Sequence, residues 1–114
     1  MLPTLADMVE IEILSMSDDI GMRIHGHANS ADLGKDTVCA AASMLAYTMA
    51  AVAQQLQQDG CLDKPPIIAL DHGEAEIHMA PRAIHMDKVY NMARAVALGA
   101  QCLGANFPAF LRVI

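Results

Sequence analysis

The 114-residue chain contains no tryptophan, and only 4% of its residues are aromatic. Its core must therefore be aliphatic, with nine methionines available to fill irregular gaps. Basic residues are also scarce, because seven lysines and arginines stand against thirteen aspartates and glutamates, a formal net charge of −6. Binding to a nucleic-acid backbone needs a basic surface, so we expect no direct nucleic-acid partner.

Cysteine is limited to Cys39, Cys61 and Cys102, and no two of them form a CxxC pair. This pattern predicts neither a disulfide framework nor a zinc ribbon, and reduced thiols are typical of the cytoplasm. The N-terminus lacks the basic residues and long apolar run of a signal peptide. The longest apolar stretch, residues 39–53, is interrupted by polar side chains and is shorter than the roughly 20 residues of a membrane span. We therefore expect a cytoplasmic protein that does not act on a membrane.

Local patterns predict strands from alternating apolar and polar residues, and helices from apolar residues at helical spacing. The predicted strands cover residues 8–16, 20–28, 67–70, 74–79 and 107–114, and the predicted helices cover 37–58 and the mid-80s to 103. Gly73 marks the turn of the second hairpin, Asp36 the N-cap of the first helix, and Gly104 the end of the second helix.

This order, β-β-α-β-β-α-β, predicts an α+β fold with two helices packed on one mixed or antiparallel sheet. Hydrophobic residues make up 54% of the chain, and the length suits one domain over residues 1–114. The last strand is apolar on both faces except at Arg112, so we expect it to be buried between other elements.

The residues that suggest chemistry lie around Gly26 and His27 and within residues 34–43. The pattern places His27 at the end of a strand and Cys39 in the first turn of a helix. At a helix N-terminus the unpaired amides favour a thiolate, and a nearby protonated histidine lowers the pKa of a thiol further. A thiolate beside an imidazole supplies the nucleophile and general base of acyl transfer.

Other residues of the same segment have predicted supporting roles. The backbone amides of Cys39 and Ala40 would stabilise the oxyanion. Ser43 lies one turn after Cys39 on the same helix face, where its hydroxyl would bond near the thiolate or to its own backbone. Asp36 either orients His27 or only caps the helix, and the sequence leaves both roles open.

Two neighbouring motifs read Gly26-His27-Ala28 and Gly34-Lys35-Asp36-Thr37-Val38-Cys39-Ala40-Ala41-Ala42-Ser43. Together they resemble the signature of the ribosomal-processing cysteine proteases, the Prp family. The resemblance implies a small bacterial homodimer that removes a short N-terminal extension from a protein of the large ribosomal subunit. It implies that His27 and Cys39 are the catalytic pair. We expect no cofactor and no bound metal.

The sequence departs from the family pattern at Thr37, where isoleucine is usual. Residues 61–82 carry no motif that aligns with the family. The choice of peptide is therefore less well predicted than the catalytic pair.

Two other functions fit parts of the pattern. His25 and His27 lie on one strand face, where both imidazoles would reach one zinc ion, and Cys39 or Asp32 would complete the ligand set. The remaining histidines are His72, His78 and His85. The second alternative is a non-catalytic, ribosome-associated or dimeric scaffold of the same fold, in which Cys39 is an ordinary thiol. The joint pattern of glycines, histidine and cysteine favours the protease.

Overall fold

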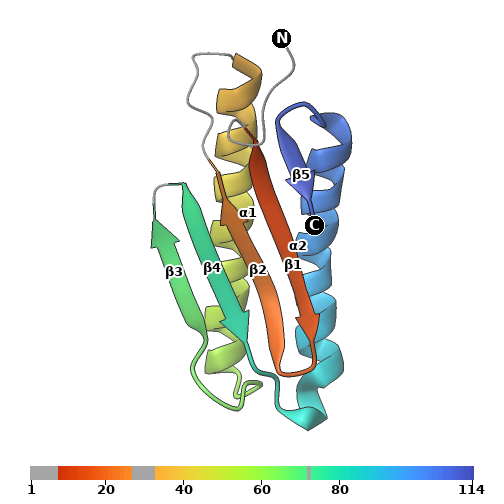
Figure 1. Cartoon of the computed structure of the whole chain (residues 1–114). Coiled ribbons are helices and arrows are strands. Elements are labelled where there is room, and N and C mark those ends of the chain that lie inside the picture. The colour runs from red at the N-terminus through yellow and green to blue at the C-terminus, as the bar shows by residue number, and fades with distance from the viewer. Residues whose placement is uncertain (1–7, 27–32, 72) are drawn as a thin grey trace.

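The computed structural model describes residues 8–26, 33–71 and 73–114, with the side chains of the first helix described from Thr37 onward. The strands are β1 (Val9–Met16), β2 (Asp19–His25), β3 (Ile67–Asp71), β4 (Glu74–Met79) and β5 (Leu111–Val113). The helices are α1 (Leu33–Gln58) and α2 (Met86–Asn106), with a short 3-10 helix, η2 (Ala83–His85), before α2. This order along the chain confirms the predicted sequence of elements (Figure 1).

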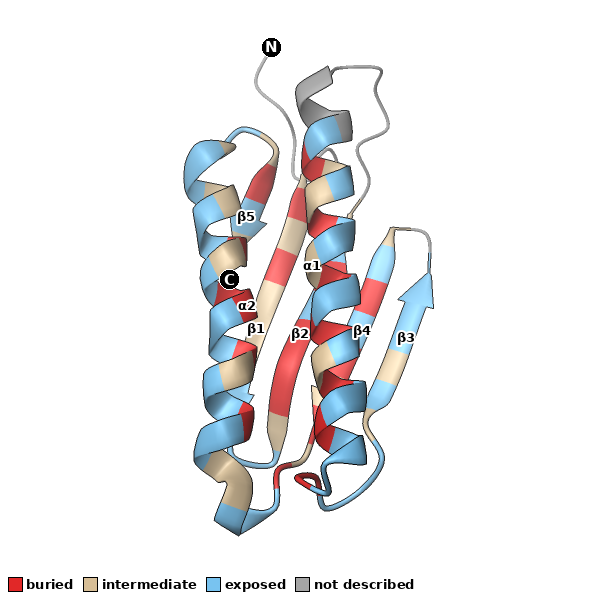
Figure 2. Cartoon of the chain, turned by 180° about the vertical axis from the view of Figure 1, so that it is seen from behind, coloured by how far each residue is buried: buried red, intermediate tan, exposed pale blue. Residues whose placement is uncertain are grey.

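The strands form one mixed sheet in the order β3-β4-β2-β1-β5. Neighbouring strands are antiparallel, except that β5 runs parallel to β1. Both helices cover the same face of this sheet (Figures 1 and 2). Helix α1 packs on β2 and β4, whereas α2 packs on β1, β2 and β5. The two-layer α+β architecture is therefore the predicted one.

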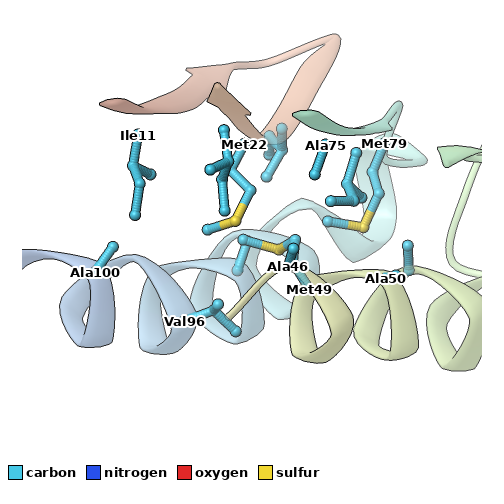
Figure 3. Packing of buried hydrophobic residues seen from close by; sticks show 14 of the residues in the cluster. Ile11, Met22, Ala46, Met49, Ala50, Ala75, Met79, Val96 and Ala100 are labelled. Carbon is cyan, nitrogen blue, oxygen red and sulfur yellow. The ribbon is translucent and has the colours of Figure 1, made fainter. Parts of the chain in front are cut away.

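The core lies between the sheet and the two helices, and its side chains are aliphatic as the composition predicts. Figure 3 shows Met22 and Met79 pointing from the sheet toward α1, where Met49 and the small side chains of Ala46 and Ala50 meet them. The alanines let the helix approach the sheet closely, and the flexible methionines fill the gaps that remain. The alternation of buried residues along β2 and β4 matches the faces predicted from the sequence.

The open face of the sheet carries charged side chains that pair across neighbouring strands. Arg23 Nε on β2 lies 2.7 Å from Glu76 Oε1 on β4, and Arg23 Nη1 lies 3.4 Å from Glu12 Oε2 on β1. His78 Nδ1 on β4 lies 2.8 Å from Asp19 Oδ1 on β2, and its Nε2 lies 3.3 Å from Glu76 Oε1 on the same strand. Cross-strand pairs of this kind stabilise a sheet face that is exposed to water.

The Glu76 carboxylate accepts hydrogen bonds from Arg23 and then from His78, and these hold the pKa of Glu76 below its ordinary value of 4.5. A carboxylate whose pKa is lowered by folding stabilises the fold above the unfolded pKa, and the stabilisation is lost as the pH falls through the folded pKa. We expect Glu76→Gln to reduce stability at neutral pH and to have progressively less effect below about pH 4.5. Urea unfolding of both proteins across this range measures the difference.

Glu74→Gln is the matched control, because it removes one exposed carboxylate from the same strand without touching the Arg23 pair. A stability difference between wild type and Glu76→Gln that stays constant from neutral to acid pH would contradict the expectation.

The C-terminal part of the chain differs from the sequence prediction. Helix α2 continues through Gly104 to Asn106 instead of ending at Leu103. A Cβ at Gly104 would lie 3.2 Å from Val113 Cγ2, so this glycine allows β5 to pack closely on α2 and does not end the helix. The last strand covers only Leu111–Val113 and lies at the sheet edge beside β1, so the prediction that it is buried between other elements was wrong.

Candidate active site

One end of the molecule brings together the segments that flank the predicted catalytic residues. Strand β2 ends there at His25, the β3–β4 hairpin turns there at Gly73, and α1 begins there (Figure 1). The predicted histidine, His27, follows the end of β2 directly but lies outside the described residues. The described site therefore consists of the end of β2, the hairpin turn and the N-terminal part of α1.

Gly26 connects β2 to the segment that contains His27, and its backbone is held from two sides. Its N–H donates a hydrogen bond to the Gly73 carbonyl oxygen at 3.1 Å. Its φ of +115° lies in the region that favours glycine, and a Cβ at this position would collide with the Met8 carbonyl oxygen. The chain therefore leaves β2 along a path defined by the hairpin turn and by the residue before β1.

Cys39 is a free, half-buried cysteine on α1, packed against the edge of the core. Its neighbour Val38 is completely buried, whereas Ser43, one turn later, is exposed. At about 100° per residue, Cys39 and Ser43 lie on the flank of α1 opposite to Ala41 and Leu45, which face α2. The Cys39 thiol is thus presented on the flank of α1 that is turned away from α2, where it packs against the core.

The start of α1 corrects the sequence prediction. The helix begins at Leu33, so Asp36 lies within its first turn and is not the N-cap, and Gly34 belongs to the helix and not to a loop. Cys39 is the seventh residue of α1, which places it in the second turn. An aspartate before a segment with apolar residues at helical spacing is typical of an N-cap. However, one glycine inside a helix costs only about 1 kcal/mol, so Gly34 does not prevent the helix from beginning at Leu33.

This shift weakens one part of the predicted chemistry. Only the first four N–H groups of a helix lack an intrahelical acceptor, and the favourable field of the helix end falls off within the first turn. The amides of Cys39 and Ala40 lie beyond that turn, so they are not the free donors that the sequence suggested for an oxyanion. Activation of a nucleophile at Cys39 must then come mainly from a neighbouring base.

The structure describes some of the other predicted site residues and not others. Ala40 and Ser43 are exposed on α1, and Gly34 and Asp36 are described as helical backbone only. Ala28 and Asp32 lie outside the described residues, as His27 does. The structure therefore positions the cysteine and the strand end that precedes the histidine, and the dyad itself stays a prediction.

The described residues do not bring together the proposed zinc ligands. The His25 side chain lies on the open face of the sheet, where Nε2 is 3.6 Å from Glu10 Oε2, whereas Cys39 lies on the helix-covered side. His78 also lies on the open face and pairs with Asp19 and Glu76. Within residues 8–26, 37–71 and 73–114, no three His, Cys, Asp or Glu side chains are placed to hold a metal ion.

Residues 8–103 match the family model described as cysteine protease Prp. The chain belongs to this family. The matched range contains Gly26, His27 and Cys39, and it confirms the resemblance inferred from the two motifs. As a member of the Prp family, the protein is a cysteine protease, as the two motifs predicted.

Solved structures share the fold of this Prp family member. SMU.848 from Streptococcus mutans is 23% identical, with a TM-score of 0.66 over 94% of this chain and 92% of that chain. The essential ribosomal processing protease Prp from S. aureus, in complex with a substrate peptide, is 17% identical, with a TM-score of 0.65 over 94% and 98% of the two chains. The same protease with a covalently linked product peptide is 19% identical, with a TM-score of 0.58 over 93% and 95%. No curated protein matches the sequence.

Sequence reasoning missed the contribution of the second hairpin to this end of the Prp fold. The residues from 61 to 82 carry no recognisable motif, yet the Gly73 carbonyl anchors the strand end before His27. The sequence predicts Gly73 as the glycine of a turn, and its φ of +80° in the structure agrees with this prediction. Its partner could not be inferred, because the pairing of β2 with β4 joins segments far apart in the sequence.

Proposed function

We propose that this Prp family member is an endopeptidase that removes a short N-terminal extension from a protein of the large ribosomal subunit. Cys39 is the nucleophile and His27 is the general base in this proposal. The observation that carries it is the position of Cys39, half-buried near the start of α1, at the same end of the molecule as the strand end that leads into His27. The S. aureus Prp structures with a substrate peptide and with a covalently linked product peptide support a peptide as the substrate.

The proposed reaction proceeds through a thioester. His27 accepts the proton of the Cys39 thiol, and the thiolate sulfur attacks the carbonyl carbon of the scissile peptide bond. When the tetrahedral intermediate collapses, the carbon–nitrogen bond breaks and His27 returns the proton to the leaving amine. Water, deprotonated by His27, then attacks the thioester carbon and releases the carboxylate product and the Cys39 thiol.

The oxyanion of this reaction needs hydrogen-bond donors other than the backbone amides in the regular part of α1. The amides of Cys39 and Ala40 were the predicted donors, but they lie beyond the first turn of the helix. Ser43 is exposed one turn after Cys39 on the same flank, and we propose its hydroxyl as a supporting donor at the site. Asp36 and Gly34 lie in the first turn of α1, and we propose that Asp36 supports the site by orienting His27 and not by capping the helix.

The remaining expectations complete the proposal. The enzyme works in the cytoplasm as a homodimer, with the N-terminal segment of the ribosomal protein as its substrate. It uses no cofactor, and neither nucleic acid nor a membrane takes part. The open face of the sheet, with its paired carboxylates, supports the exclusion of a nucleic-acid backbone there.

Incubation with the precursor of the ribosomal protein from the same organism tests the proposed function. Mass spectrometry should show removal of one N-terminal peptide at a single bond, and no change in the mature protein that lacks the extension. Scattered cleavage of both forms would indicate a protease of another specificity. Absence of cleavage by the folded, reduced enzyme would contradict the proposed substrate.

A further inference from the structure

Strand β5 covers only part of the outer edge of β1. The pairing of the two strands ends at Ile11 opposite Val113, well before the end of β1. The Ile13 N–H donates to the Ile114 carbonyl oxygen at 3.5 Å, so this residue directs its backbone groups toward the β5 side. Backbone groups alternate between the two sides of a strand, so the N–H and C=O of Ser15 point to the same side, beyond β5. This part of β1 is therefore a sheet edge at which another strand can pair.

A cavity of about 230 Å³ lies beside this edge, between β1 and α2. Figure 1 shows that β5 ends partway along β1, whereas α2 continues beside the rest of the strand. One water in the liquid takes up about 30 Å³, so the cavity has room for a side chain. The residues that line it at three- or four-residue spacing on α2 include Tyr90, Arg94, Leu98 and Gln101, and those on β1 include Ile13 and Ser15.

Arg94 is a cation on the wall of this cavity, and no described carboxylate pairs with it. Its described hydrogen bond runs from Nη1 to the Tyr90 hydroxyl oxygen over a long 3.4 Å. A guanidinium has five N–H donors, so most of them remain available. By contrast, Arg23, Lys88 and Arg112 each pair with a carboxylate. In a chain with thirteen acidic residues, an arginine without such a partner beside a cavity is placed to bind an anion from outside.

We propose that an extended peptide segment of a partner protein, carrying an acidic side chain, binds in this β1–α2 notch. We define the notch by the edge of β1 at Ile13 and Ser15 and by the wall of α2 at Arg94 and Leu98. The peptide pairs with β1 as an additional strand in line with β5, and the acidic side chain on its helix-facing side binds Arg94. This binding site is independent of the peptidase reaction.

The spacing of strand and helix predicts the motif that the notch prefers. Alternate residues of a strand lie on one side, about 6.6 Å apart. Four residues of a helix rise about 6 Å, so Arg94 and Leu98 are separated by almost the same distance. A peptide that places a carboxylate on Arg94 therefore places the side chain two positions away beside Leu98, which is 46% exposed. We expect an acidic and an apolar residue with one residue between them.

Charge favours such a peptide over other anionic partners. A nucleic-acid backbone or an anionic lipid surface needs several cations, whereas Arg94 is the one basic side chain among the described residues that line the notch. The net charge of −6 repels a strongly acidic partner at long range. Both facts favour a single carboxylate beside an apolar side chain. A free small carboxylate would also satisfy Arg94, but it would leave the backbone groups of Ser15 without a strand, so the test must separate the two ligands.

The notch lies away from the candidate active site. Ser15 precedes the turn between β1 and β2, whereas the candidate site lies where β2 ends, at the opposite end of the same hairpin (Figure 1). Peptide binding in the notch and cleavage at the site can therefore be measured separately. Failure of one does not imply failure of the other.

Nuclear magnetic resonance titration of the ¹⁵N-labelled wild-type protein with a synthetic peptide tests the proposal. The probe is a short, acetylated and amidated threonine peptide in which leucine and glutamate stand two positions apart. The amide signals of Ser15, Arg94 and Leu98 should shift and saturate, with a Kd below about 1 mM. The amide signal of Cys39 should stay unchanged. A probe with glutamine in place of glutamate should bind at least about tenfold more weakly.

Arg94→Gln should weaken binding of the glutamate probe by at least about tenfold and leave binding of the glutamine probe unchanged. Lys88→Gln is the matched control, because it removes the same charge from α2 but its ammonium pairs with Asp59 outside the notch. It should leave the Kd of both probes unchanged. Arg94 and Lys88 are exposed, and circular dichroism confirms that each variant is folded.

A second pair of probes tests the strand pairing without a change to the protein. The glutamate probe is N-methylated on one or the other set of alternate residues, which removes the N–H donors of one side of the strand. One of the two should bind at least about tenfold more weakly, because its donors face β1. Absence of saturable binding, equal binding of the glutamate and glutamine probes, or wild-type affinity of Arg94→Gln would overturn the proposal. Undiminished binding of both N-methylated probes would also overturn it and would assign the cavity to a free carboxylate.

Discussion

Cys39→Ala is expected to lower the rate of precursor cleavage by at least about a thousandfold. The sulfur of Cys39 forms the covalent intermediate, and alanine offers no nucleophile in its place. His27→Ala should cause a loss of similar size, because the thiol of Cys39 loses the base that ionises it. Since the two residues act as one unit, the double substitution should be little worse than either single one. Single-turnover cleavage of the ribosomal protein precursor measures all three.

The other cysteines serve as controls for this expectation. Cys102 is exposed on α2, far along the chain from the site, and Cys102→Ser should keep full activity under reducing conditions. Cys61 is buried, with 1% of its surface exposed, so Cys61→Ala should cost a little stability and keep the cleavage activity. Cys39→Ala retaining more than a tenth of the wild-type rate, or Cys102→Ser losing activity, would show that the nucleophile lies elsewhere.

Gly21→Ala is expected to destabilise the fold by about 3 kcal/mol or more. Gly21 lies in β2, between β1 and β4, and pairs with Leu14 and His78. A Cβ at Gly21 would collide with the backbone carbonyl of Ile77, and a backbone group cannot move aside as a flexible side chain can. The sheet would have to open at its centre, which would weaken the pairing of β2 with β4.

Gly60→Ala is the matched control for this substitution. Gly60 follows the end of α1 with a φ of +73°, but apart from its chain neighbours no atom lies within 4 Å of the position of its Cβ. Alanine there meets only the intrinsic cost of the left-handed region, about 1 kcal/mol. Urea unfolding followed by circular dichroism compares the two variants. Equal losses at Gly21 and Gly60 would show that the close approach to Ile77 is unimportant.

The strands of both hairpins could be predicted because their signals are local. Alternation along β2 identifies its buried face without knowledge of any partner, and the buried Ile20, Met22 and Ile24 match it. The apolar stripes of α1 and α2 are local signals too. The position of β5 was mispredicted because Leu111–Val113 pairs with β1, about a hundred residues earlier, and no local pattern reports such a pairing.

The features of the candidate site were also predictable only where their signals are local. The motifs around Gly26 and Cys39 indicate a thiol nucleophile and its base, because they depend on residue types at short spacing. The start of α1 was mispredicted because Asp36 has the local features of an N-cap, although the helix continues back to Leu33. The hydrogen bond between Gly26 and Gly73 joins two hairpins and could not be inferred from either one.

By itself, the sequence determined the order of elements, the faces that are buried, the aliphatic core and the cysteine protease family, since all of these depend on composition and short-range pattern. The tertiary structure alone decided that His25 and Cys39 lie on opposite sides of the sheet and that the β3–β4 turn supports the strand end before His27. It also decided that α1 and α2 lie side by side on one face of the sheet. The physical reason is that a local pattern specifies which side of an element avoids water, whereas only long-range packing specifies what covers it.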